Sequence, residues 1–122
     1  MLATTLRKRY KPTLKKRSLD ATVRHLLAHA AAQPSGRSAE TVYGGHEHVL
    51  RQTVIALLQG QSLDDHENPG EATVYVLHGR VRVATHDTQW DAIAGDLLAL
   101  PPVRHRLDAV TDSAILLTVA KA

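Results

Sequence analysis

Cysteine is absent from the 122 residues of the chain, which excludes a disulfide framework, a thiolate nucleophile and a sulfur-ligated metal. A reducing compartment is the simplest setting for such a protein, and we expect it to be cytoplasmic. No apolar run approaches the roughly 18 residues of a membrane-spanning helix, so no membrane partner is expected. Aromatic residues make up only 3% of the chain. A protein so poor in them gains stability by covering an exposed sheet face, which favours a homodimer.

Acidic residues are absent from the first 17 positions, although the net charge of the whole chain is only +3. The rest of the chain carries 12 acidic and 8 basic residues, a net charge of −4. We therefore predict that residues 1–17 form a basic flexible extension. Its cations suit nucleic-acid phosphates, but there is no recognition helix and only Tyr10 for stacking, so we do not expect nucleic acid as a partner. Seven basic residues lie in this segment: Arg7, Lys8, Arg9, Lys11, Lys15, Lys16 and Arg17.

Residues 18–34 carry the signals of a short helix. Ser18 is a favoured N-cap, and Asp20 follows in the first turn, where negative charge is stabilising. The sequence Gln-Pro-Ser-Gly at 33–36 ends the helical pattern. Apolar residues recur at helical spacing, which predicts that one face packs against the rest of the protein. These residues are Leu19, Val23, Leu26, Leu27 and Ala30.

From residue 37 onward the pattern changes to short β runs. Gly44-Gly45 predicts a tight turn between the first two strands. Turn signals at intervals of about 8–12 residues indicate a sandwich or a barrel. We therefore expect one all-β domain over residues 37–122. Its strands are predicted at 41–43, 49–58, 73–77, 80–85, 90–93, 96–100, 104–109 and 114–119.

Two spaced motifs give the chain a resemblance to a known family. Gly60, His66 and Gly79 fit the first signature motif of the cupin superfamily, and Gly95 and Pro101 fit the second. The histidine of the second motif, His105, arrives one residue early, and Val103 stands where glycine is expected. Over about residues 38–120 the chain resembles a small single-domain cupin. The glycines fall at corners between strands, where a positive φ or a close backbone approach is needed.

The resemblance implies a cupin-type double-stranded β-helix, which is a jelly-roll barrel, and a homodimer. It also implies a divalent metal ion (Zn, Fe, Mn or Ni) held inside the barrel by three histidines and a glutamate. The corresponding positions here are occupied by His66, Asn68, Ala72 and His105. The two family motifs are therefore degenerate at two of their four ligand positions.

Only two of these side chains are good metal ligands, His66 and His105. Asn68 offers a neutral carbonyl, which suits a hydrogen bond better than a transition metal, and Ala72 offers no donor. Glu71 is a further candidate ligand, as is Glu67, although each is displaced by one residue and a regular strand would point it to the opposite face. Without a metal, the two imidazoles line a cavity and hydrogen-bond each other, water or a ligand.

Gln52 and Arg51 lie in the middle of an aliphatic strand, and one of them should face the barrel interior. A buried polar group there needs a partner, which a bound ligand could supply. The predicted ligand-binding residues are therefore His66, Asn68, His105 and Gln52. Histidines outside the motifs, at positions 25, 29, 46 and 48, are interpreted as solvated surface residues.

Two functions follow from these residues. The first is a small-molecule-binding cupin with a degenerate metal site, non-catalytic or sensor-like. The second is a divalent-metal-dependent cupin enzyme, a dioxygenase, isomerase or decarboxylase, that acts on a small organic acid. The substituted ligand positions favour the first, and the presence of His66 and His105 keeps the second open. The chain has no nucleophile, base and orienting group in a catalytic pattern, and no phosphate-binding glycine loop, so catalytic residues are not assigned.

Overall fold

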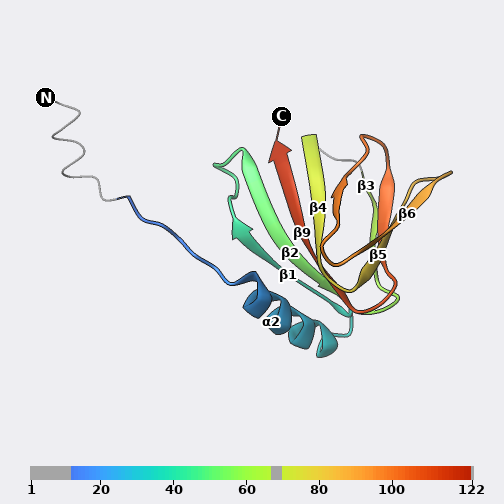
Figure 1. Cartoon of the computed structure of the whole chain (residues 1–122), viewed down its shortest axis with the longest axis horizontal. Coiled ribbons are helices and arrows are strands. Elements are labelled where there is room, and N and C mark those ends of the chain that lie inside the picture. Colours follow the sequence, from blue (N-terminus) through green and yellow to red (C-terminus); the bar gives the residue numbers. More distant parts are fainter. Residues whose placement is uncertain (1–11, 67–69, 122) are drawn as a thin grey trace, which may run out of the picture.

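Two antiparallel sheets face each other in the computed structural model, which describes residues 12–66 and 70–121 (Figure 1). The five-stranded sheet has the order β1 (Arg37–Tyr43), β2 (Leu50–Leu57), β9 (Ser113–Lys121), β4 (Gly70–His78) and β7 (Leu97–Ala99). The four-stranded sheet has the order β3 (Ser62–His66), β8 (His105–Ala109), β5 (Arg80–Ala84) and β6 (Gln89–Ile93). The predicted all-β jelly-roll barrel is confirmed.

The helix α2 (Leu19–Ala31) covers the outer face of the five-stranded sheet. Ser18 caps it, and the Ser18 hydroxyl accepts a hydrogen bond of 3.2 Å from the Ala21 N–H, as capping residues do. The buried side chains of the helix pack on strand residues that point away from the barrel interior. This outer cluster consists of Val23, Leu26, Ala30, Val54, Ala56 and Ala114.

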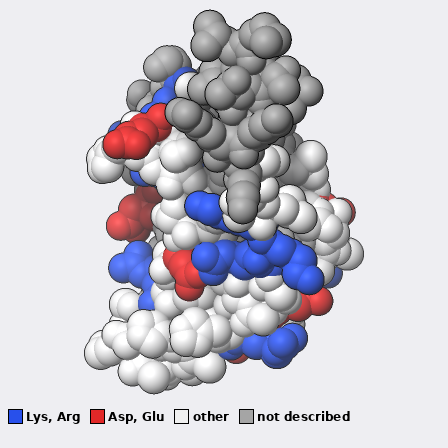
Figure 2. All heavy atoms as spheres, turned by 90° about the vertical axis from the view of Figure 1, so that its left-hand side faces the viewer, with Lys and Arg blue, Asp and Glu red and all other residues white. Residues whose placement is uncertain are grey.

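Residues 12–17, the described part of the predicted extension, are exposed and lie in neither helix nor strand. Arg17 forms an ion pair with Glu40 of β1. Figure 2 shows lysine and arginine side chains across the face that carries the helix, with acidic side chains among them. Within residues 12–66 and 70–121, no helix is long and apolar enough to cross a membrane.

The barrel interior is filled by side chains that alternate along each strand. In β4, Ala72, Val74 and Val76 are buried inside, whereas Glu71 and Tyr75 are exposed on the outer face. Residues of both sheets form one inner core, which explains why a chain without phenylalanine can close a barrel. This core contains Leu57, Val74, Val76, Val81, Val83, Ala92, Leu107, Ala109 and Ile115.

The connection between β1 and β2 differs from the tight turn predicted at Gly44-Gly45. Residues 44–49 join the two strands, and the pairing reaches only Tyr43 and Gln52 at that end. Hydrogen bonds from β9 hold this loop instead of a hairpin turn. The Lys121 ammonium donates to the carbonyl oxygen of Gly45 at 2.8 Å, and the Lys121 N–H donates to that of Val49 at 2.9 Å.

Two glycines of the first motif occupy positive-φ corners, but their surroundings differ. Gly79, between β4 and β5, has a φ of +80°, and a Cβ placed there would lie 2.2 Å from the Asp112 carbonyl oxygen. Gly60, between β2 and β3, has a φ of +87°, with no other atom within 4 Å of such a Cβ. Gly79 is therefore required both for its conformation and for its lack of volume.

Replacing these glycines with alanine should separate the two requirements. Gly60→Ala should lower the free energy of unfolding by about 1 kcal/mol, the usual cost of a left-handed conformation for a residue with a Cβ. Gly79→Ala should cost at least about 2 kcal/mol more, because the corner must also move away from Asp112. Urea unfolding of both variants measures the difference. Equal losses would contradict the steric part of the argument.

Candidate functional site

A cavity of about 280 Å³ lies between the two sheets. Seven of its nine lining residues are aliphatic, and the two polar ones are Asp64 and His105. We call it the interior cavity. A mostly apolar pocket with a few polar groups is the usual form of a small-molecule site. The aliphatic lining consists of Ile55, Leu63, Val74, Leu100, Leu107, Ile115 and Leu117.

His105 begins β8 and has only 1% of its surface exposed. Its Nδ1 lies 2.8 Å from the carbonyl oxygen of Val103. Because a carbonyl oxygen can only accept a hydrogen bond, Nδ1 carries the ring proton. In the neutral imidazole the lone pair is then on Nε2, which is buried. His105 therefore presents a hydrogen-bond acceptor in an aliphatic environment.

Asp64 lines the same cavity, although sequence analysis did not select it. Regular alternation from the inward Leu63 would point residue 64 outward. The pairing of β3 with β8 is irregular, because Leu63 pairs with Leu107 whereas His66 pairs with His105. One extra residue is thus inserted in β3, a β-bulge, and bulges redirect side chains near binding sites. The predicted strands do not include residues 62–66, so the sequence pattern gave no signal for this side chain.

The structure places the predicted residues His66 and His105 opposite each other. Their backbones pair directly in β3 and β8. Asn68, the third predicted ligand-binding residue, lies outside the described residues, and so does Glu67. Ala72 is 7% exposed and on the interior side of β4, as expected for a position equivalent to a ligand.

Gln52 and Glu71 are not brought to the interior cavity. Gln52 shares the outer face of β2 with Val54, and its side-chain amide donates to the Thr118 hydroxyl at 3.2 Å. Arg51, the alternative residue, is four positions before the inward Ile55 and therefore lies on the same face of β2. Glu71 is exposed and, together with Thr118, lines a different pocket. The expectation that Gln52 contacts a ligand in the barrel therefore has no support in its position.

The described residues do not fit the four-ligand metal set that the family resemblance implies. They contain no group of three or more His, Asp or Glu side chains able to hold a metal ion. His105 and Asp64 are the two candidate donors on the interior cavity, whereas catalytic zinc sites use three protein ligands.

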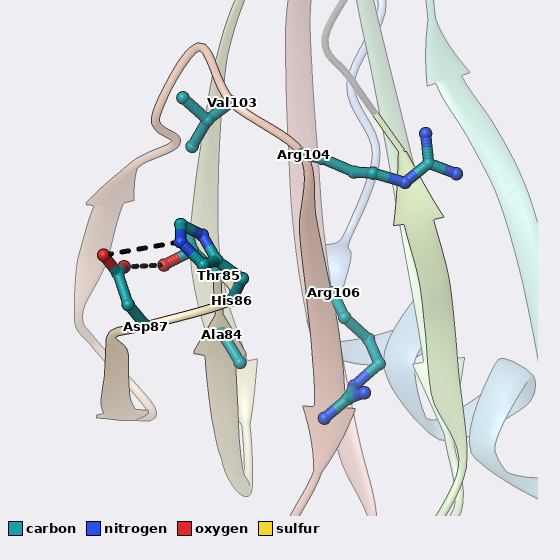
Figure 3. A pocket seen from close by; sticks show the side chains of 7 residues that line it. All are labelled: Ala84, Thr85, His86, Asp87, Val103, Arg104 and Arg106. Atoms are coloured by element: carbon teal, nitrogen blue, oxygen red, sulfur yellow. Dashed lines mark hydrogen bonds and ion pairs between the residues drawn. The ribbon is translucent and has the colours of Figure 1, made fainter.

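A second, larger hollow lies on the outside of the barrel (Figure 3). Its volume is about 780 Å³, and we call it the outer recess. Figure 3 shows Arg104 extending away from the β5–β6 hairpin, while His86 and Asp87 lie together at the hairpin tip. Arg106 is paired with Asp108 at 2.9 Å. The recess is lined by Ala84, Thr85, His86, Asp87, Val103, Arg104 and Arg106.

Two charged side chains of the outer recess, Asp87 and Arg106, have neighbours of opposite sign. The hydrogen bond from Thr88 and the neighbouring His86 lower the pKa of the Asp87 carboxyl below its usual value. On the outer face of β6, the Arg82 guanidinium donates to Asp91 at 2.7 Å, which lowers the pKa of Asp91 and raises that of Arg82. Exposed pairs of this kind contribute little binding energy. The interior cavity, and not the larger recess, is the stronger candidate site.

The jelly-roll topology and a mostly aliphatic cavity lined by two polar residues define a barrel of the kind that encloses small ligands. The sequence profile of the cupin domain matches residues 53–120, more than half of the chain. The protein therefore belongs to the cupin family. None of the curated proteins matches the chain.

Solved structures agree with this assignment of the fold. An RmlC-like cupin protein from Desulfovibrio desulfuricans is 23% identical with a TM-score of 0.60, and the match covers 91% of this chain and 94% of that one. A conserved protein of unknown function from Streptococcus pyogenes is 26% identical with a TM-score of 0.66, covering 74% and 78%. A cupin superfamily protein from Desulfitobacterium hafniense is 15% identical with a TM-score of 0.65, covering 70% and 78%.

The tautomer of His105 is directly measurable. In a long-range ¹H–¹⁵N correlation spectrum at neutral pH, the neutral His105 ring should show its proton on Nδ1 and an unprotonated Nε2, because Val103 accepts from Nδ1. His86, whose side chain is 92% exposed, serves as the solvated reference. A neutral His105 ring with its proton on Nε2 would contradict the acceptor role in the cavity.

Proposed function

We propose that this cupin binds a small, largely apolar molecule that carries a hydroxyl or another hydrogen-bond donor. The observation that carries the proposal is the His105 ring, whose Nδ1 is committed to Val103 and whose buried Nε2 is the acceptor on an aliphatic cavity. A donor group on the ligand can hydrogen-bond to this nitrogen. A bound molecule would then be oriented by one polar contact and held by apolar burial.

The size of the interior cavity supports a ligand of about the size of a substituted ring. A cavity of about 150 Å³ lined by aliphatic and aromatic side chains holds benzene. The interior cavity has about 280 Å³, nearly twice that volume, and leaves room for a ring with a substituent.

The polar lining favours a donor over an anion. Asp64 is the second polar residue on the cavity, and a carboxylate repels a carboxylate ligand at short range. A phenol or an alcohol can donate to His105 or to Asp64 without this penalty. We therefore favour a neutral hydroxylated molecule as the ligand over the small organic acid expected for the cupin enzyme.

The second candidate is the divalent-metal-dependent enzyme, and one observation favours it. The backbone of His66 pairs directly with that of His105, so two histidines occupy neighbouring positions on β3 and β8. Against it stands Ala72, which supplies no ligand at the position of the family's glutamate. We therefore favour ligand binding over catalysis as the function of this protein.

Ligand preference tests the proposal. Isothermal titration with 4-methylphenol, toluene and benzoate should rank the phenol first and the anion last. The hydroxyl should be worth about 1 kcal/mol over toluene, the net value of one hydrogen bond. In His105→Leu this advantage should disappear while toluene still binds.

Gln52→Leu is the matched control, because it removes a polar side chain from the outer face of β2 and should leave the ranking unchanged. Benzoate binding as tightly as 4-methylphenol, or an advantage of the hydroxyl that survives in His105→Leu, would contradict the proposed orientation. The circular dichroism spectrum of each variant reports on its fold.

Metal content separates the two candidate functions. Protein expressed in medium supplemented with Zn, Fe, Mn and Ni should carry less than roughly 0.2 metal ions per chain, because two donors make a weak site. Inductively coupled plasma mass spectrometry measures this ratio after gel filtration. A ratio close to one metal ion per chain that falls in His105→Leu would favour the enzyme.

A further inference from the structure

Trp90 is the only tryptophan of the chain, and it faces the inside of the barrel while remaining 44% exposed. In β6, Trp90 and the buried Ala92 are two residues apart and face the same side, whereas Asp91 points outward to Arg82. An inward residue of this size is normally covered. Its exposure means that the space in front of the indole is open.

Strand pairing places Trp90 in one row with residues of the interior cavity. Leu63 pairs with Leu107, Leu107 with Val83, and Val83 with Trp90, across all four strands of the sheet. β6 is two strands away from β8, a lateral distance of about 10 Å at the usual strand spacing. Trp90 therefore lies on the same inner surface as His105, displaced sideways toward the edge of the barrel.

A second, smaller cavity lies in front of the indole. Its volume is about 160 Å³, and we call it the side pocket. Leu100 lines both the side pocket and the interior cavity, so the two share a wall. All of its lining residues are apolar or aromatic: Val83, Trp90, Leu98, Ala99, Leu100 and Pro101.

We propose that the side pocket is a subsite for the apolar end of the ligand and that Trp90 determines which chain lengths bind. This inference rests on the proposed function. The ligand class becomes an elongated amphipathic molecule, such as an alkyl-substituted phenol, with its hydroxyl at His105 and its alkyl chain extending past Leu100 to Trp90. Burial of the half-exposed indole by the alkyl chain supplies the affinity.

A series of 4-alkylphenols with methyl, propyl and pentyl chains tests the subsite. Affinity for the full-length protein should rise about fourfold per added methylene, as for full apolar burial. The tryptophan emission, which comes from Trp90 alone, should shift to the blue and become protected from iodide with the longer chains. In Trp90→Ala the dependence on chain length should be largely lost, whereas Trp90→Phe should keep most of it.

Ile93→Ala is the matched control, since Ile93 is a 50% exposed apolar residue on the outer face of the same strand. It should leave the affinities unchanged. If 4-methylphenol binds but the longer alkylphenols bind no more tightly and leave the tryptophan emission unchanged, the subsite is overturned and the proposed function stands. Failure of every phenol to bind would overturn both. Sedimentation compares the oligomeric state of Trp90→Ala with that of the unchanged protein. If the variant loses a dimer while its affinities for the phenols stay the same, Trp90 is a contact between copies and the subsite is overturned.

Discussion

Burial of the five-stranded sheet on both of its faces is the constraint on which the rest of the barrel depends. The helix α2 covers Val54, Ala56 and Ala114 on one face, and the four-stranded sheet covers Leu57 and Ile115 on the other. A slip of one residue in β2 or β9 would exchange these two sets. The register is therefore fixed from both sides. The inward side chains of the facing sheet are packed against a rigid wall, which leaves the interior cavity with defined dimensions.

The position of His105 follows from this frame. As the first residue of β8 it enters the barrel beside Leu107, and the turn before it supplies the Val103 carbonyl that fixes the ring. An imidazole held in this way offers one acceptor and little freedom, which suits recognition of a donor. Family membership alone would have suggested a metal at this place. Ala72 and the outward Glu71 explain why the chain's own residues argue for an organic ligand.

The elements that depend on local signals could be predicted from the sequence. The Ser18 cap, the apolar stripe of α2 and the glycine corners are encoded by residues close together in the chain, so the helix and the barrel class were predictable. Asp64 was missed because β3 was not among the predicted strands, and because the bulge that directs its side chain depends on pairing with a distant strand. The sequence left open which of Gln52 and Arg51 faces the interior, because this depends on the pairing of β2 with β9. The side pocket in front of Trp90 was not predictable, because periodicity does not reveal an open space in front of a side chain.

Ligand recognition by His105 inside the barrel is the central claim, and a crystal structure of the full-length protein with 4-propylphenol tests it most directly. We expect the phenol in the interior cavity, with its oxygen at hydrogen-bond distance from His105 Nε2 and its alkyl chain directed past Leu100 toward Trp90. A phenol found only in the outer recess or between molecules, with the interior cavity unchanged, would contradict it.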